Sequence, residues 1–130
     1  MRVPMVLCSV LLCACFAPML SAQDAVKTDP KHYSVISEND QVRILKVHYG
    51  PHEKSIMHSH PNTVAVFLTD ANAQFTFPDG KTQALTPKAG DAQYTAAGTH
   101  LPENMGDKGM DVILVELKGK AAKGMSMEKK

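Results

Sequence analysis

Cysteine is missing from nearly all of this 130-residue sequence. The three cysteines are Cys8, Cys13 and Cys15, and all of them lie in an apolar stretch at the amino terminus. If that stretch is removed, the remaining chain cannot form a disulfide and offers no thiolate to a metal. Any metal that the remaining chain binds must then be held by nitrogen and oxygen atoms.

The sequence also lacks an excess of charge of either sign. Its 14 lysines and arginines face 13 aspartates and glutamates, and loss of Arg2 with the amino-terminal stretch would make the two totals equal. A chain without a basic excess has little electrostatic attraction for nucleic acid or an anionic membrane. We therefore expect no nucleic acid as a partner and no membrane for the mature form.

The amino-terminal stretch has the layout of a secretory signal peptide. A positive start at Arg2 precedes an almost wholly apolar run over residues 3–20, and Ala22 offers a small residue before the polar Gln23. This pattern predicts a signal peptide over residues 1–22 and a periplasmic or secreted protein. The alternatives are an uncleaved anchor, which normally needs about 20 apolar residues between polar flanks, and a lipoprotein, because LCAC at residues 12–15 loosely resembles a lipobox.

Helical periodicity is absent too, because no segment after residue 22 keeps a helical period for three turns. Short stretches of β-branched, aromatic or alternating residues are instead separated by Gly, Pro, Asn or Asp at spacings of about ten residues. We expect strands at residues 41–49, 63–69, 73–77, 81–86, 92–95 and 110–118. The pattern predicts an all-β sandwich or barrel, with a hairpin turn at Asp79-Gly80.

These strands predict a single β-barrel domain over residues 41–118. Residues 23–40 are expected to form an amino-terminal lead-in, since their first part is polar and contains Pro30. Residues 119–130 are lysine-rich and have no strand pattern, so we expect a flexible tail there. The open edge strands of a small barrel need cover, which makes a homodimer a further expectation.

The stretch IMHSHPNT, residues 56–63, holds the first candidate metal ligands. In a strand, residues i and i+2 point to the same face, so His58 and His60 would project together. Two such imidazoles can bind one divalent ion at about 2.0–2.2 Å, but a useful site needs a third ligand. His100 is the natural candidate, because it follows the sharp approach of residues 96–99 after a predicted strand. The alternative is a chance polar pair on an exposed edge.

The His-x-His pair resembles the first sequence motif of the cupin family, which runs Gly, five residues, His-x-His, three or four residues, Glu. His58 and His60 match its histidines, and His52 stands where the family has the Gly. A non-Gly residue there is expected to need a positive φ, which His tolerates better than most residues. His52 is also a further candidate ligand.

The second cupin motif is matched in order by Gly90, Gly98, His100 and Asn104. Ala96 replaces a Pro of that motif, and one residue fewer separates Gly98 from His100. The resemblance spans residues 42–117, nearly the whole predicted domain. It implies a cupin-type jelly-roll β-barrel as the fold.

The chain departs from the family at the metal-binding Glu of the first motif, which should fall at Thr63, Val64 or Ala65. The resemblance still implies a site made of the three histidines His58, His60 and His100. Three neutral imidazoles suit a divalent transition metal such as Fe, Zn, Cu or Ni better than Mn or Mg. Cupin relatives that oxidise thiols hold iron with three histidines, so the missing Glu does not exclude catalysis.

Glu103 is the candidate that replaces the missing carboxylate, either as a ligand or as a general base. On a regular strand Glu103 would point away from His100, so this role requires an irregular segment. The alternative role for Glu103 is a surface carboxylate or one that orients an imidazole.

Three functions fit the sequence. The resemblance implies an exported metal-dependent enzyme, of the dioxygenase type rather than an isomerase or lyase, that acts on a small organic substrate through the three-histidine site. The second function is a non-catalytic module that binds a metal or a small ligand. The third is a metal-free structural barrel whose histidines line a water-filled mouth.

Overall fold

The computed structural model describes residues 23–119. The predicted signal peptide at residues 1–22 and the tail beyond residue 119 lie outside the described residues. Within the described part, no helix is long and apolar enough to cross a membrane.

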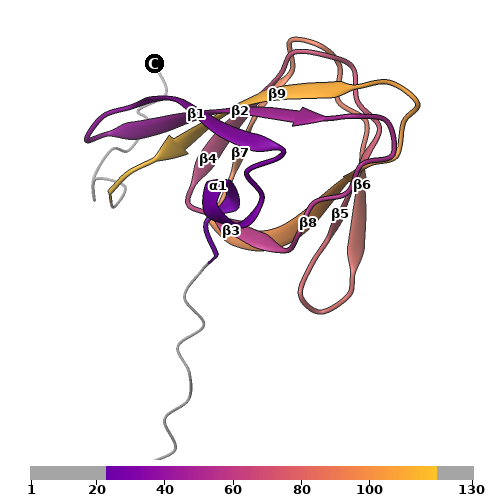
Figure 1. The fold of residues 1–130 in the computed structure, drawn as a ribbon, viewed down its shortest axis with the longest axis horizontal. Coiled ribbons are helices and arrows are strands. Elements are labelled where there is room, and N and C mark those ends of the chain that lie inside the picture. The colour runs from indigo at the N-terminus through magenta and orange to yellow at the C-terminus, as the bar shows by residue number, and fades with distance from the viewer. Residues whose placement is uncertain (1–22, 120–130) are drawn as a thin grey trace, which may run out of the picture.

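The described chain is built from strands, with one short helix before them (Figure 1). In chain order the elements are α1 (Ala25–Thr28), β1 (Tyr33–Glu38), β2 (Val42–Tyr49), β3 (His58–His60), β4 (Thr63–Phe67), β5 (Ala73–Thr76), β6 (Thr82–Leu85), β7 (Ala92–Thr95), β8 (Gly98–Asn104) and β9 (Met110–Leu117). One sheet has the order β1-β2-β9-β4-β7 and the other has the order β3-β8-β5-β6. The all-β prediction is therefore confirmed.

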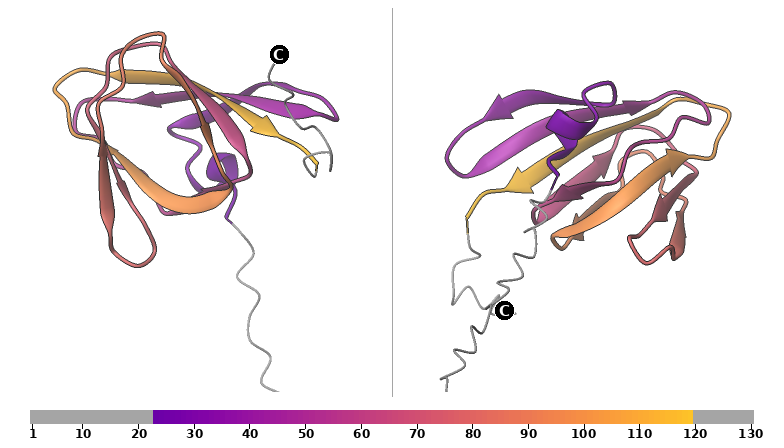
Figure 2. Two further views of the ribbon diagram at one scale, coloured as in Figure 1. Left: turned by 180° about the vertical axis from the view of Figure 1, so that it is seen from behind. Right: turned by 60° about the horizontal axis from the view of Figure 1, so that its bottom comes forward.

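The two sheets enclose a common interior. Figure 1 shows β1, β2 and β9 on one side of the barrel and β3 and β8 on the other, and Figure 2 shows the same layers from two further directions. Inward-facing side chains alternate along β2 and β9, which pair through Leu45 with Leu114 and Val47 with Val112. Leu45 and Val47 are buried, and burial of such a side chain contributes roughly 1.5–3 kcal/mol to folding.

The hairpin predicted at Asp79-Gly80 is confirmed. β5 and β6 pair in antiparallel register with Phe75 opposite Gln83. Gly80 takes a φ of +84°, a left-handed conformation that glycine adopts without strain. This hairpin places β6 so that Gln83 and Leu85 line the interior cavity.

Three strands lie outside the six ranges that the sequence pattern predicted: the short β3, which carries His58 and His60, and the longer β1 and β8. β1 occupies part of the predicted lead-in and pairs with β2, so residues of the lead-in belong to the first sheet. Its alternation is masked because Val35 and Ile36 are both exposed on this edge strand. β8 contains Pro102, which argues against a strand in a sequence pattern, yet β8 pairs with both β3 and β5.

Candidate metal centre

The pairing of β3 with β8 brings three histidines together. His58 lies directly opposite His100 in the antiparallel register, and His60 is on the same face of β3 as His58. Each of the three offers a ring nitrogen, and these nitrogens lie within 4.8 Å of one another. The His58 and His60 Nε2 atoms are only 3.0 Å apart.

His58 is fully buried. Its Nδ1–H donates a hydrogen bond of 2.7 Å to the carbonyl oxygen of Ile56, which fixes the tautomer of a neutral ring and leaves Nε2 without a proton. Burial, reinforced by the neighbouring His60, lowers the pKa of His58 to about 4. At neutral pH the Nε2 lone pair of His58 is therefore free.

His60 is oriented by a buried carboxylate. Its Nδ1 donates a hydrogen bond of 2.8 Å to Oε1 of Glu116, a residue only 2% exposed. The other carboxylate oxygen of Glu116 accepts a hydrogen bond of 2.6 Å from Nε of Arg43, which also contacts Asp24. Burial raises the pKa of Glu116, but the hydrogen bonds from His60 and Arg43 outweigh it and the net pKa is lowered.

Glu116 also lies next to the position at which the cupin motif has its Glu and this chain has none. In the β4–β9 register it stands directly opposite Thr63, one of the positions at which the cupin motif has its Glu. Because Glu116 engages the Nδ1 side of His60, its carboxylate faces away from Nε2. The neighbouring strand thus supplies a carboxylate that orients a histidine.

His100 completes the group and has an unpartnered nitrogen. Its Nε2 is buried and, within the described chain, has no hydrogen-bond partner. Its ring packs on Phe75 with centroids 4.4 Å apart. Burial, followed by the proximity of His60 and His58, lowers the pKa of His100 to about 3.

These three histidines fit a metal ion. With the Nδ1 atoms of His58 and His60 engaged by Ile56 and Glu116, the two Nε2 atoms face each other at 3.0 Å, where neutral rings would present two lone pairs. Lone pairs so close repel unless a proton or a cation lies between them. One ring nitrogen of His100 lies within 4.8 Å of those of His58 and His60, and its Nε2 is buried without a partner. Three imidazole nitrogens are a common donor set for a divalent transition metal.

A second buried polar cluster lies behind His58. Ser55 donates through Oγ to Oδ2 of Asp29 at 2.6 Å, and this Oγ lies 3.3 Å from Nδ1 of His58. His32 links Asp29 to Glu53, with its ring nitrogens 2.6 Å and 2.8 Å from the two carboxylates. Burial raises the pKa of Asp29, but the hydrogen bonds from Ser55 and His32 outweigh it and lower the net pKa.

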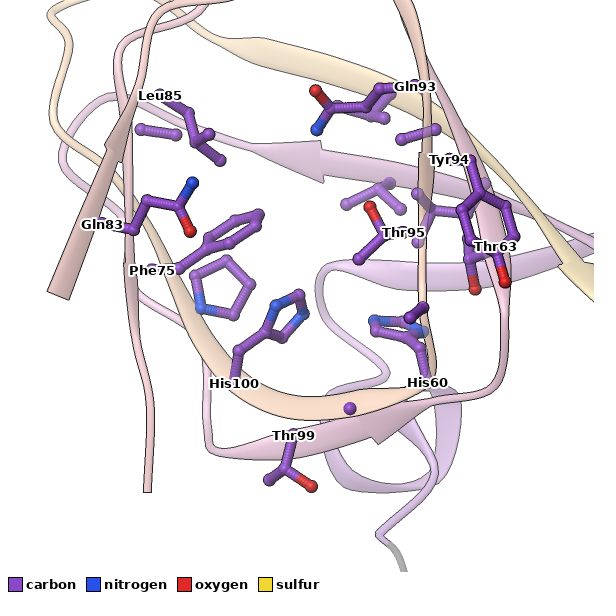
Figure 3. A pocket seen from close by; sticks show the side chains of 18 of the residues that line it. His60, Thr63, Phe75, Gln83, Leu85, Gln93, Tyr94, Thr95, Thr99 and His100 are labelled. Atoms are coloured by element: carbon purple, nitrogen blue, oxygen red, sulfur yellow. The ribbon is translucent and has the colours of Figure 1, made fainter. Parts of the chain in front are cut away.

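A cavity of about 670 Å³ opens beside the histidines. His60 and His100 line it, and both point towards its interior in Figure 3. Its walls are mainly aliphatic and aromatic; they include Val47, Phe67, Phe75, Leu85, Met110, Val112 and Leu114. A volume of this size suits a small organic molecule.

The structure does not bring the two further candidates to this group. His52 is exposed, and its Nε2 lies 2.6 Å from Asp107 instead. Its φ of +56° agrees with the positive φ expected at the position of the family Gly. Glu103 lies within the regular strand β8, three residues beyond His100 and therefore on the opposite face, and it does not line the cavity. The irregular segment that a role for Glu103 requires is not present.

Sequence reasoning missed Glu116 and Asp29. A signal for Glu116 exists, because it continues the inward-facing series of Val112 and Leu114 along β9, and a charge on an apolar face needs a buried partner. Asp29 has no such signal, since it lies in a polar segment before the first strand.

Comparison with solved structures identifies the fold. A cupin domain from Bordetella pertussis Tohama I matches with a TM-score of 0.63 and 19% identity, over 77% of this chain and 99% of its own. A conserved protein with a double-stranded β-helix domain from Klebsiella pneumoniae matches with a TM-score of 0.56 and 22% identity, over 69% of this chain and 78% of its own. A cupin superfamily protein from Desulfitobacterium hafniense matches with a TM-score of 0.52 and 17% identity, over 67% and 76% respectively.

These matches show that the chain has the cupin fold, as the two motifs predicted. No protein-family model matches the sequence, and no curated protein matches it. The function therefore has to be argued from the site.

Proposed function

We propose that this protein is an exported, metal-dependent enzyme of the oxygenase type that acts on a small organic molecule. The observation that carries the proposal is the convergence of three histidine nitrogens, with two of the histidines, His60 and His100, lining an apolar cavity. His58, His60 and His100 are the proposed ligands of a divalent transition metal, with Fe, Zn, Cu and Ni as candidates. A metal held by three ligands keeps open positions, at which it supplies Lewis-acid or redox chemistry to a bound molecule.

The protein's own residues prepare such a site. Hydrogen bonds to Ile56 and Glu116 fix the tautomers of His58 and His60, so that both present Nε2 to the same place. Outer partners of this kind raise the basicity of a ligand and hold its orientation. The apolar walls exclude water from the space where a substrate would meet the metal.

The residues that line the cavity favour oxidation over proton abstraction. Among the described residues, no aspartate or glutamate lines it. Tyr33 and Tyr49 do, but burial raises the pKa of both hydroxyls, so they remain protonated at neutral pH. Isomerase and lyase reactions generally need a base beside the substrate, and the lining offers none apart from the proposed ligands.

Export is proposed from the signal-peptide pattern of residues 1–22. Expression of the full chain in a bacterium with a periplasm, followed by amino-terminal sequencing of the mature form, tests it. We expect a start at Gln23 in the periplasmic fraction. An uncut cytoplasmic protein would contradict this part of the proposal.

Elemental analysis of the purified protein tests the metal site. The mature chain is prepared without a metal-binding tag, beside the double variant His58→Ala/His100→Ala and the control His52→Ala, which removes an exposed histidine. We expect about one equivalent of a transition metal in the wild type and the control, and its loss in the double variant. Less than about a tenth of an equivalent, unchanged in the double variant, would contradict the site.

Dioxygen consumption by the iron-loaded protein then separates the enzyme from a non-catalytic module. Oxygen uptake that depends on an added organic substrate, and that the double variant lacks, is expected for an oxygenase. Stoichiometric metal without turnover on a broad substrate panel would favour the binding module.

A further inference from the structure

The cavity beside the histidines has an unusual lining for a site that binds a polar metabolite. Of the described residues that line it, none is Asp, Glu, Lys or Arg. Charged side chains near the histidines form ion pairs with each other instead, as Glu116 does with Arg43. A ligand in this cavity therefore finds no side-chain counter-ion.

Two glutamines supply neutral polar groups away from the histidines. Gln83 is on β6 and Gln93 is on β7, the end strands of the two sheets on the side away from β1 and β3. In Figure 3, Gln93 lies across the pocket from His60 and His100, and Gln83 lies beside Phe75.

Strand geometry supports this placement independently of the view. Gln83 pairs with Phe75, which pairs with Pro102 on β8, so Gln83 is two strands away from the strand of His100. Neighbouring strands are about 4.8 Å apart, which puts Gln83 about 10 Å from β8. On β7, Thr95 pairs with Thr63, the first residue of β4 after β3, whereas Gln93 pairs with Ala65 further along β4. Both Gln93 and Thr95 line the cavity, and of the two Gln93 is the one further from β3.

A carboxamide donates and accepts hydrogen bonds but carries no charge. It can therefore hold a carbonyl, amide or hydroxyl group. It cannot compensate a carboxylate, a phosphate or an ammonium group, and a charge that leaves water without a partner loses hydration free energy. Both glutamines are exposed, so solvent reduces this penalty without removing it.

We propose that the substrate is a largely apolar molecule with a metal-binding group at one end and an uncharged hydrogen-bonding group at the other, the latter held by Gln83 or Gln93. This inference rests on the proposed metal site, because none of the described residues that line the cavity is a Lys or Arg that could replace the metal as a counter-ion for the metal-binding end. It excludes substrates with a second anionic group, such as dicarboxylates and organic phosphates.

Three matched probes test the substrate class on the zinc-loaded protein. Benzohydroxamate, 4-carbamoylbenzohydroxamate and 4-carboxybenzohydroxamate share a metal-binding end and differ only at the far end. We expect the carbamoyl probe to bind about tenfold or more tightly than the carboxy probe by isothermal titration calorimetry, with the unsubstituted probe between them. Equal or tighter binding of the carboxy probe would overturn the inference.

Variants assign the preference to the two glutamines. Gln83→Lys and Gln93→Lys should each shift the ratio towards the carboxy probe by about tenfold, because each supplies a counter-ion. Gln74→Lys is the matched control, since Gln74 is on β5 next to Phe75 but does not line the cavity. A ratio that changes as much in Gln74→Lys as in the other two variants would contradict the assignment.

The outcomes separate this inference from the proposed function. If the protein takes up no zinc, the metal site and the inference fail together. If zinc binds stoichiometrically and the three probes bind equally or not at all, the substrate class alone is wrong.

Discussion

At the scale of single residues, the carboxylate nearest to the histidines lies on a different strand from the one that the cupin motif predicts. The cupin motif predicts a Glu near Thr63, and the chain has none there, but Glu116 stands opposite Thr63 on β9. From that strand the carboxylate reaches the Nδ1 side of His60. A carboxylate that contacts a histidine thus stands opposite the position of the expected ligand, and a metal bound by the three histidines would have no carboxylate ligand from that position and more open positions.

Glu116→Gln should weaken metal binding about 10- to 100-fold, because the neutral amide no longer fixes the tautomer of His60 or raises its basicity. Zinc affinity measured by competition with a chromophoric chelator checks this. Glu103→Gln is the matched control, as Glu103 does not line the cavity. Unchanged affinity in Glu116→Gln, or an equal loss in the control, would show that Glu116 does not orient a ligand.

The stability of the metal-free protein should fall as the pH drops from about 6.5 towards 5. The folded-state pKa values of His58 and His100 are lowered to about 4 and about 3, whereas unfolded histidine titrates near 6.5. In this window the unfolded chain therefore binds more protons than the folded chain, and acid favours unfolding. The lowered pKa values of Asp29 and Glu116 act in the same direction only at lower pH.

Thermal unfolding in the presence of a chelator at pH 7, 6 and 5 measures this effect. The variant His58→Gln/His100→Gln should show a flatter profile, because it lacks both imidazoles. A wild-type melting temperature that stays constant from pH 7 to pH 5 would mean that these histidines are not held neutral by the fold.

At the scale of elements, the segment before β1 packs behind two of the proposed ligands, His58 and His60. Asp24 caps α1 and contacts Arg43, which binds Glu116 behind His60. Asp29 ends α1 and binds Ser55 behind His58. The segment also pairs with β3, since the Ser59 amide donates to the Gln23 carbonyl oxygen at 2.7 Å. One short segment therefore supports the surroundings of two of the three proposed ligands.

Asp29→Ala should lower the free energy of unfolding by about 1–3 kcal/mol, because the buried His32 and Ser55 each lose a hydrogen bond to its carboxylate. Urea denaturation of the metal-free protein measures the change. Asp40→Ala, at an exposed position, is the control and should alter stability by less than about 0.5 kcal/mol. Similar values for the two variants would show that the Asp29 cluster is not a structural support.

The sequence predicted elements whose signal is local. The strands with clear alternation, the Asp79-Gly80 turn and the grouping of His58 with His60 all follow from neighbours in the chain. β1 was missed because both sides of this edge strand carry exposed residues, and β8 because Pro102 interrupts its pattern. Glu116 and Asp29 bind residues that are distant in the chain, such as Arg43 and Ser55. Spacing in the sequence does not predict such contacts.

At the scale of the whole molecule, the buried charged groups of the described chain are paired with one another or with polar side chains. The buried carboxylates are bound to Arg43, His60, His32 or Ser55, and the described residues that line the cavity include no Asp, Glu, Lys or Arg. A barrel built in this way can hold a metal in an apolar space. The central claim is that this metal sits among the three Nε2 atoms.

Anomalous diffraction from crystals of the zinc-loaded mature protein tests this claim most directly. We predict a single strong peak about 2.0–2.1 Å from Nε2 of His58, His60 and His100, with Glu116 still bonded to Nδ1 of His60. Zinc bound elsewhere, or no peak among these three nitrogens at full zinc loading, would contradict the account.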